Sequence, residues 1–234
     1  MKFFRYCWGT AFCILIAALF FGCSSPIQNA EKLAMTDPDS AIAAYKNIMQ
    51  QKPNSDEAKM AHLGMADTYY KRLEDQEKGL EVYEEIAKAY PDTKYSGEAY
   101  WAIAMHYFQA KDYEKARDNF AKVTQDMPGT EKASDASLAI AKCYEELKKF
   151  DEAAKMYSEF SKTHASHRRA AQAGLDAARI YDRELNKPEM AVEEYKHVAS
   201  EYALSSSGRE ARETLEERGV EVADVTELVE EEVP

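Results

Sequence analysis

An aromatic residue recurs every 37 or 38 positions along this chain, and that period constrains the fold more than any other feature. Each aromatic residue follows an alanine or glycine by four positions and precedes an apolar residue by three. At these spacings the three side chains share one face of an α-helix. The aromatic column comprises Tyr45, Tyr83, Phe120, Tyr157 and Tyr195, and its small partners are Ala41, Gly79, Ala116, Ala153 and Ala191.

A second column of small residues alternates with the first. It comprises Ala66, Ala104, Ala141 and Ala178, and each is followed three positions later by tyrosine. Small residues let two helices cross at the short end of the usual spacing of about 8–10 Å. The two columns predict an all-α solenoid of about five helix pairs over residues 36–218.

We name the helices of the second column A helices and those of the aromatic column B helices. Aspartates at plausible helix starts and Pro53, Pro91 and Pro128 at helix ends support the boundaries. The expected B helices are 39–52, 76–90, 112–127, 151–164 and 188–202, and the expected A helices are 56–72, 94–110, 131–148, 167–185 and 206–218.

One unit carries a recognisable set of spacings. Ala104, Tyr107, Ala116, Phe120 and Pro128 stand 3, 9, 4 and 8 residues apart. These spacings resemble the tetratricopeptide (TPR) signature, whose usual period of 34 residues is lengthened here by about three residues after the proline. This longer variant resembles the TPR arrays of bacterial outer-membrane lipoproteins, a group that includes the barrel-assembly component BamD and the periplasmic coordinator CpoB.

The N-terminus has the pattern of a signal peptide. Lys2 and Arg5 precede an apolar run over residues 11–21, which is short for a membrane span. Gly22-Cys23 then resembles the end of a lipoprotein signal, although Phe20 stands where that signal usually has leucine. The resemblance implies that residues 1–22 are removed and that Cys23 carries the lipid, palmitate included. The alternative is an uncleaved anchor helix.

Net charge argues against one class of partner. The formal charge is −12, whereas a nucleic-acid binder needs basic surface to displace phosphate counterions. If residues 1–22 are removed, Cys143 is the only thiol left besides the lipidated Cys23. It is expected to be a small buried apolar residue, with a reactive thiol as the alternative.

The TPR resemblance implies a concave surface lined mainly by A helices. In this chain that surface is expected to be apolar and aromatic in its N-terminal half and charged in its C-terminal half. The alternative for Trp101 and Phe108 is packing against neighbouring helices. The expected partner-binding residues are Leu63, Tyr70, Trp101, Met105, Phe108, Leu138, Lys142, Arg179 and Arg183.

Other signals are weaker. His164 and His167 are spaced to share a helix face, but no third metal ligand lies near them in sequence, so a solvated helix start or a small basic patch is favoured over a metal site. No phosphate loop, nucleophile elbow or catalytic triad spacing is found, so we expect neither catalysis, nor a cofactor, nor a small-molecule substrate. Residues 23–35 are expected to be a tether, and residues 219–234, with six acidic residues, a solvated tail or an added strand.

These observations predict a lipid-anchored, periplasm-facing scaffold at the bacterial outer membrane that binds envelope proteins or peptide segments. The resemblance implies two roles: BamD-like assembly of outer-membrane proteins, or a CpoB-like adaptor in cell-wall synthesis and division. An inner-membrane anchor and an unrecognised enzyme remain as alternatives.

Overall fold

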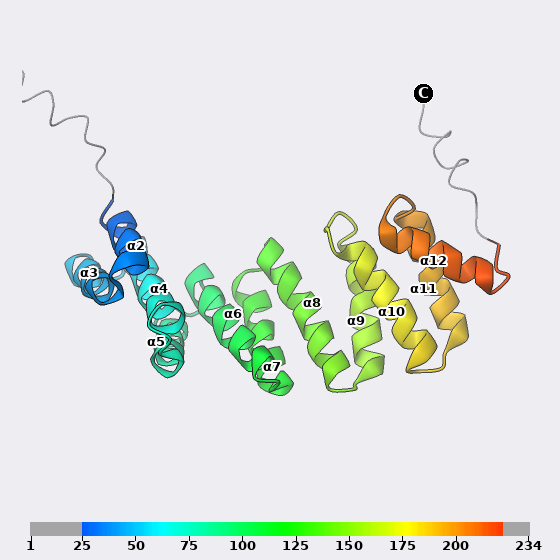
Figure 1. The fold of residues 1–234 in the computed structure, drawn as a ribbon, viewed down its shortest axis with the longest axis horizontal. Coiled ribbons are helices and arrows are strands. Elements are labelled where there is room, and N and C mark those ends of the chain that lie inside the picture. Colours follow the sequence, from blue (N-terminus) through cyan, green and yellow to red (C-terminus); the bar gives the residue numbers. More distant parts are fainter. Residues whose placement is uncertain (1–24, 222–234) are drawn as a thin grey trace, which may run out of the picture. The chain divides into compact units, whose positions relative to one another are not determined.

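The computed structural model describes residues 25–221 of the chain. Within this range the chain forms eleven α-helices and no strand, which confirms the all-α prediction. The helices divide into two compact units, residues 25–82 and 83–221, and the division falls inside one helix, α5. Figure 1 shows the helices in chain order, from α2 in blue to α12 in red.

Unit 1 contains three complete helices and the first half of α5. They are α2 (Pro26–Thr36), α3 (Pro38–Gln51), α4 (Asp56–Lys71) and α5 (Gln76–Ala89). Helix α3 packs against both α2 and α4. Gly79 of α5 lies directly against Tyr70 of α4, which brings these two helices close together.

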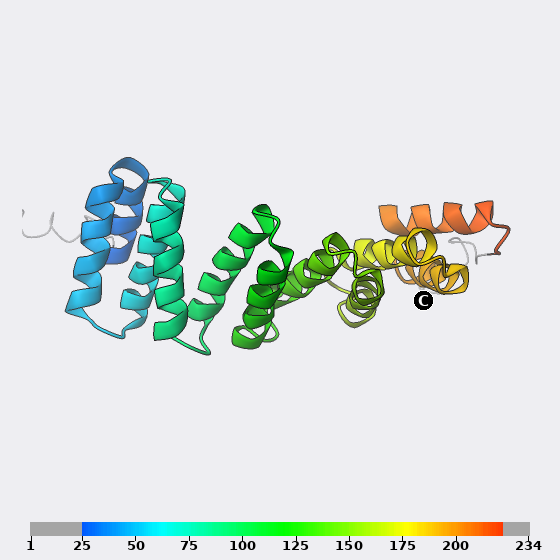
Figure 2. The ribbon, with the colours of Figure 1, turned by 90° about the horizontal axis from the view of Figure 1, so that it is seen from below.

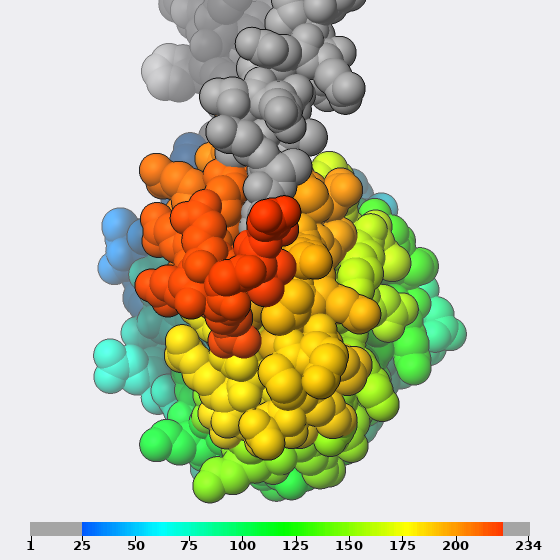
Figure 3. Space-filling view, turned by 90° about the vertical axis from the view of Figure 1, so that its right-hand side faces the viewer, coloured from blue at the N-terminus to red at the C-terminus, as the bar shows by residue number. Residues whose placement is uncertain are grey.

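Unit 2 continues from Tyr83 with seven further helices, each packed against the next. They are α6 (Lys94–Gln109), α7 (Tyr113–Asp126), α8 (Glu131–Glu146), α9 (Phe150–Thr163), α10 (Ala170–Arg183), α11 (Pro188–Glu201) and α12 (Ser206–Glu217). Figure 2 shows α6 to α12 of this unit following one another as a stack. Helix α12 also packs against α10, and Figure 3 shows its side chains beside those of α11 at the end of the unit.

The periodic columns form the core. All five aromatic residues of the column are at most 5 % exposed, and their alanine partners are completely buried. The A-helix alanines Ala66, Ala104, Ala141 and Ala178 are also completely buried. Fully burying such an aromatic ring contributes about 1.5–3 kcal/mol, so the period in the sequence marks the residues that hold the stack together.

The turns from A to B helices repeat one geometry. In each, the residue before the B-helix N-cap adopts a left-handed conformation, as Lys111 does with φ of 61°. The next backbone N–H then donates to the carbonyl of the tyrosine that follows the A-helix alanine by three positions, as Asp112 does to Tyr107 at 2.9 Å. Asp112 and Lys149 thereby complete Schellman motifs, whereas Asp75 and Lys187 bond to a carbonyl six residues earlier. Both arrangements satisfy carbonyl groups left open at the helix end.

The N-terminal boundary of the array differs from the prediction. Residues 26–35, expected to be a tether, belong to α2, which begins with a Ser25–Gln28 capping box and a proline in its first turn. Ile27, Ala30 and Ala34 are buried, at spacings of three and four residues. The array therefore begins about ten residues earlier than the periodic columns indicated.

The A helix expected at 167–185 differs from the prediction in the other direction, because it starts later, at Ala170. Residues 164–169 form a turn in which the backbone N–H of His167 donates to the carbonyl of His164. The C-terminal boundary is close to the prediction, because Gly219 ends α12 with φ of 70° and Val220 packs back onto the core.

Three predictions fall on residues outside the described range: the signal peptide at 1–22, lipid attachment at Cys23, and most of the acidic tail. Within residues 25–221 no helix has the length and apolar character needed to cross a membrane.

Candidate partner-binding groove

A groove with a cavity volume of about 620 Å³ lies on unit 2. Side chains of α8 and α10 make most of its wall, and α6, α9 and the turn before α10 complete it. Its apolar lining is Phe108, Leu138, Phe150, Tyr157, Ala173 and Ile180, and its polar lining is Lys142, Glu145, Arg169, Gln172, Asp176, Arg179, Arg183 and Glu184.

Helical spacing explains why these residues meet. Leu138, Lys142 and Glu145 follow one another at intervals of four and three along α8. Asp176, Arg179 and Arg183 follow at three and four along α10. Residues three or four apart lie on one face of a helix, so each A helix presents one mixed apolar and charged stripe to the groove.

On the α8 side the charged groups are already paired. The Lys142 ammonium lies 2.9 Å from a Glu145 oxygen, and the Tyr157 hydroxyl donates to the other oxygen at 3.1 Å. Burial, reinforced by the charge of Glu145, raises the pKa of Tyr157 far above its usual range. Tyr157 therefore remains a neutral hydroxyl donor at all physiological pH values.

On the α10 side Arg179 is ion-paired, whereas Arg183 has no ion-pair partner among the described residues. The Arg179 guanidinium lies 3.3 Å from Asp176 and also pairs with Glu210 of α12, yet its buried Nε has no hydrogen-bond acceptor among the described residues. Burial raises the pKa of Asp176, partly offset by its hydrogen bond from Gln172 and the charge of Arg179. Arg183 is exposed and makes no ion pair with any residue in the range 25–221.

The structure brings together five of the predicted groove residues: Phe108, Leu138, Lys142, Arg179 and Arg183. Leu138 is only 2 % exposed, so most of its side chain belongs to the core beneath the groove. Phe108 lines the groove and also packs edge-on against Tyr113, with ring centroids 5.3 Å apart.

Two other predicted residues serve as packing. Trp101 lies edge-on to Phe120 with ring centroids 5.3 Å apart, and Lys132 lies over its ring at 5.6 Å. Trp101 and Met105 both pack around the core cluster of Phe120 and are absent from the groove lining. For Trp101 the packing alternative is therefore the one the structure supports.

The remaining two predicted residues belong to unit 1. Leu63 lines a separate cavity of about 380 Å³ together with Met35, Met60 and Tyr45. Tyr70 lies against Gly79, where it closes the contact between α4 and α5.

Arg169 and Tyr157 line the groove but were not predicted to do so. The TPR-based assignment considered only a few positions close to the small residue of each A helix, whereas Tyr157 comes from α9 and Arg169 lies before the first turn of α10. Tyr157 carried a signal, because it belongs to the aromatic column. For Arg169 the only sequence signal of a binding role was that two basic residues, 168 and 169, stand together.

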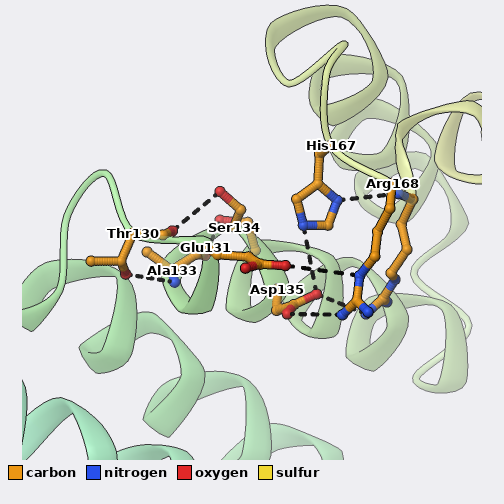
Figure 4. A network of polar contacts seen from close by, with 9 residues as sticks. Thr130, Glu131, Ala133, Ser134, Asp135, His167 and Arg168 are labelled. Carbon is orange, nitrogen blue, oxygen red and sulfur yellow. Dashed lines mark hydrogen bonds and ion pairs between the residues drawn. The ribbon is translucent and has the colours of Figure 1, made fainter.

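A second polar cluster joins the turn before α10 to α8, and Figure 4 shows its groups pointing toward one another. Asp135 lies 3.0 Å from Arg169, 3.7 Å from Arg168 and 3.8 Å from the Nε2 atom of His167. Glu131 completes the cluster at 3.9 Å from Arg168. The turn is thereby fixed to α8 by one carboxylate that faces three basic side chains.

The Glu131, Asp135 and His167 atoms lie close enough together to hold a metal ion. The hydrogen bonding of His167 argues against that use, because the backbone N–H of Arg169 donates to its Nδ1 atom at 3.2 Å. An acceptor Nδ1 places the proton of a neutral imidazole on Nε2, the atom that would have to bind the metal. Arg168 and Arg169 already neutralise the carboxylates. His164, the other predicted candidate, stacks on Phe160 instead.

Comparison with known proteins supports the repeat assignment. Residues 60–93 and residues 107–178 each match a tetratricopeptide-repeat family. A search of curated protein sequences found no match.

Solved structures of MamA have a similar fold. One, titled "Crystal structure of MamA protein", is 16 % identical, covers 85 % of this chain and 98 % of its own, and has a TM-score of 0.54. Another, titled "Crystal structure of MamA", is 18 % identical with coverages of 74 % and 92 % and a TM-score of 0.53. At this identity the similarity establishes the fold alone. Residues 60–93 and 107–178 of this chain are therefore tetratricopeptide repeats, carried in an all-α repeat fold.

Proposed function

We propose that this protein is a membrane-anchored adaptor that binds segments of partner proteins in the groove of unit 2. The observation that carries the proposal is the groove itself, in which apolar side chains lie beside the uncommitted guanidinium of Arg183. Apolar contacts supply affinity in such a site, and an arginine fork selects and orients a carboxylate. The preferred ligand is a peptide segment with apolar residues and at least one carboxylate.

Crosslinking in cells tests this proposal. A photoreactive residue at Glu184, an exposed groove position, should capture one discrete partner. The matched control is Glu189, which is also exposed, at the start of α11, but lies outside the groove lining. Capture from both positions alike, or from neither, would overturn the groove assignment.

Charge reversal provides the second half of the test. Arg183→Glu should reduce capture at least several-fold, because it places a carboxylate where the ligand carboxylate would bind. Arg209→Glu alters an exposed arginine of α12 outside the groove and should leave capture unchanged.

The proposed anchor is a lipid on Cys23. Two or three acyl chains give stable membrane attachment, since each buried CH₂ contributes about 0.8 kcal/mol. Confinement at a membrane raises the effective concentration of the groove near membrane-bound partners. The test is metabolic labelling with a palmitate analogue. Label should be incorporated into the wild-type protein and absent from Cys23→Ser, and label retained in that variant would refute attachment at this residue.

The resemblance to envelope TPR lipoproteins supports placing this adaptor at the outer membrane, facing the periplasm. Two roles follow, and the crosslinked partner separates them. A barrel-assembly role predicts capture of an outer-membrane barrel protein, whereas a cell-wall or division role predicts capture of peptidoglycan synthases with no effect on barrel insertion. Barrel-assembly components of the BamD kind have longer insertions between their repeats than this array has, residues 90–93 being one of its turns, and this difference favours the second role.

A further inference from the structure

The groove of unit 2 has a candidate occupant within the same chain. Residues 222–234 contain five acidic residues and no basic one. Three valines, Val222, Val225 and Val229, stand three and four positions apart, which is the spacing of one helical face. The segment therefore has the mixture of apolar and acidic residues that the groove is suited to bind.

The chain leaves α12 close to one end of the groove. Gly219 and Val220 close α12 with a Schellman motif in which the N–H of Val220 donates to the carbonyl of Leu215 at 2.9 Å. Arg218, just before this turn, lies 2.5 Å from Asp182 of α10. Residues 222–234 therefore begin within a few residues of a contact to α10, the helix that makes most of one groove wall.

The segment is long enough to follow the groove. Thirteen residues, counted from 222 to 234, reach at most about 43 Å when extended and about 20 Å as a helix. Helix α10, with 14 residues, is itself about 21 Å long. Either conformation can therefore cover the α10 wall from Arg183 toward Asp176.

The groove also contains an arginine side chain that forms no ion pair with any residue in the range 25–221. Arg183 has no ion-pair partner within residues 25–221, and the buried Nε of Arg179 has no acceptor there. Arg183 is exposed in the groove lining, so it is the cation that a carboxylate can reach. Lys142 and Arg169, in contrast, already face Glu145 and Asp135.

We propose that residues 222–234 bind in the groove of unit 2 and compete there with the partner segment. The valines pack against Phe108 and Phe150, the partly exposed apolar side chains of the groove, and the carboxylates face Arg183. The segment thereby acts as a built-in competitor that raises the partner concentration needed for binding. This inference uses the same groove as the proposed function, and the experiment below separates the two.

The test is photo-crosslinking within the full-length protein, with the photoreactive residue placed at Leu228. We expect an intramolecular link to a peptide between residues 138 and 184. Arg183→Glu should lower its yield several-fold, and adding Glu230→Lys and Glu231→Lys should restore it. Arg209→Glu, the matched control on α12, should leave the yield unchanged. Links only to α11 or α12, links between two chains, or a yield insensitive to Arg183→Glu would each overturn the proposal.

Partner capture distinguishes this inference from the proposed function. Glu230→Lys with Glu231→Lys should increase capture from the Glu184 probe, because it weakens the competitor. Unchanged capture alongside a Leu228 link outside the groove rejects the competitor and leaves the adaptor function standing. A groove link without any partner captured at Glu184 rejects the adaptor function and leaves the intramolecular contact standing.

Discussion

Gly79 and Gly97 occupy the same position, the fourth residue of α5 and of α6, and yet the structure predicts that Gly79→Ala is the less stable of the two alanine variants. A Cβ added at Gly79 would lie 2.6 Å from Cβ and 2.9 Å from Cα of Tyr70. A Cβ added at Gly97 would lie 2.5 Å from Cγ and 2.6 Å from Sδ of Met127. The first neighbour is largely fixed backbone, whereas the second is a flexible side chain.

The magnitudes follow from two opposing effects. Alanine gains about 1 kcal/mol over glycine in a helix interior. At Gly79 the overpacking costs about 1–3 kcal/mol, because α5 has to move away from α4 to restore ordinary contact. Gly79→Ala should therefore be neutral to destabilising by about 2 kcal/mol. At Gly97 the methionine can change rotamer, so Gly97→Ala should be neutral to stabilising by about 1 kcal/mol.

Thermal unfolding followed by circular dichroism measures the difference. For a chain of this size about 1 kcal/mol corresponds to roughly 2–4 °C in Tm, so the two variants should be separated by several degrees. Hydrogen exchange should report the loosening in α4 and α5 alone, because each repeat contacts mainly its neighbours. A Gly79→Ala protein at least as stable as Gly97→Ala would refute the argument that Tyr70 backbone limits this crossing.

Three further predictions concern unit 2. Ala116→Leu should destabilise by about 1–3 kcal/mol, since Ala116 is completely buried in the A–B seam, and an unchanged melting curve would contradict this. Asp176→Asn should stabilise the folded protein at neutral pH, because burial raises the folded-state pKa of Asp176 and its charged form therefore disfavours folding. This gain in stability should disappear as the pH falls through the raised pKa toward the ordinary value of about 3.9. A gain that grows on acidification would have the wrong sign. Asp135→Ala should cost about 1–3 kcal/mol and speed proteolysis within residues 164–169, because the 18 % exposed carboxylate faces three basic groups. Glu131→Ala, at 71 % exposure, should change stability by less than about 1 kcal/mol.

Helix positions were predicted well because the signals for them are local in sequence. Small, aromatic and apolar residues at fixed offsets define a helix face, and prolines mark where most B helices end. Helix α2 was not predicted, because the columns of small and aromatic residues do not extend to it. Counting back 38 positions from Ala66 and Tyr69 gives Gln28 and Glu31, which are polar. Its buried face instead uses Ile27, Ala30 and Ala34 in a different register.

The groove was predicted only in part, for a different reason. Trp101 and Leu138 occupy equivalent positions in successive A helices, yet Trp101 packs on Phe120 while Leu138 lies under the groove. Equivalent positions in the repeat therefore have different surroundings, which residue spacing does not record. The pairing of Asp135 with His167 and Arg169 joins residues more than thirty positions apart, and no local pattern indicates it.

By itself the amino-acid sequence determined that this protein is a stack of helix pairs and which small and aromatic residues form the seams, because burial at a helical period is recorded in residue spacing. Only the tertiary structure decided which A-helix side chains share one groove and that Arg183 is left without a partner among residues 25–221. Those properties depend on how each helix sits against its neighbours, and they arise from contacts between residues far apart in the chain.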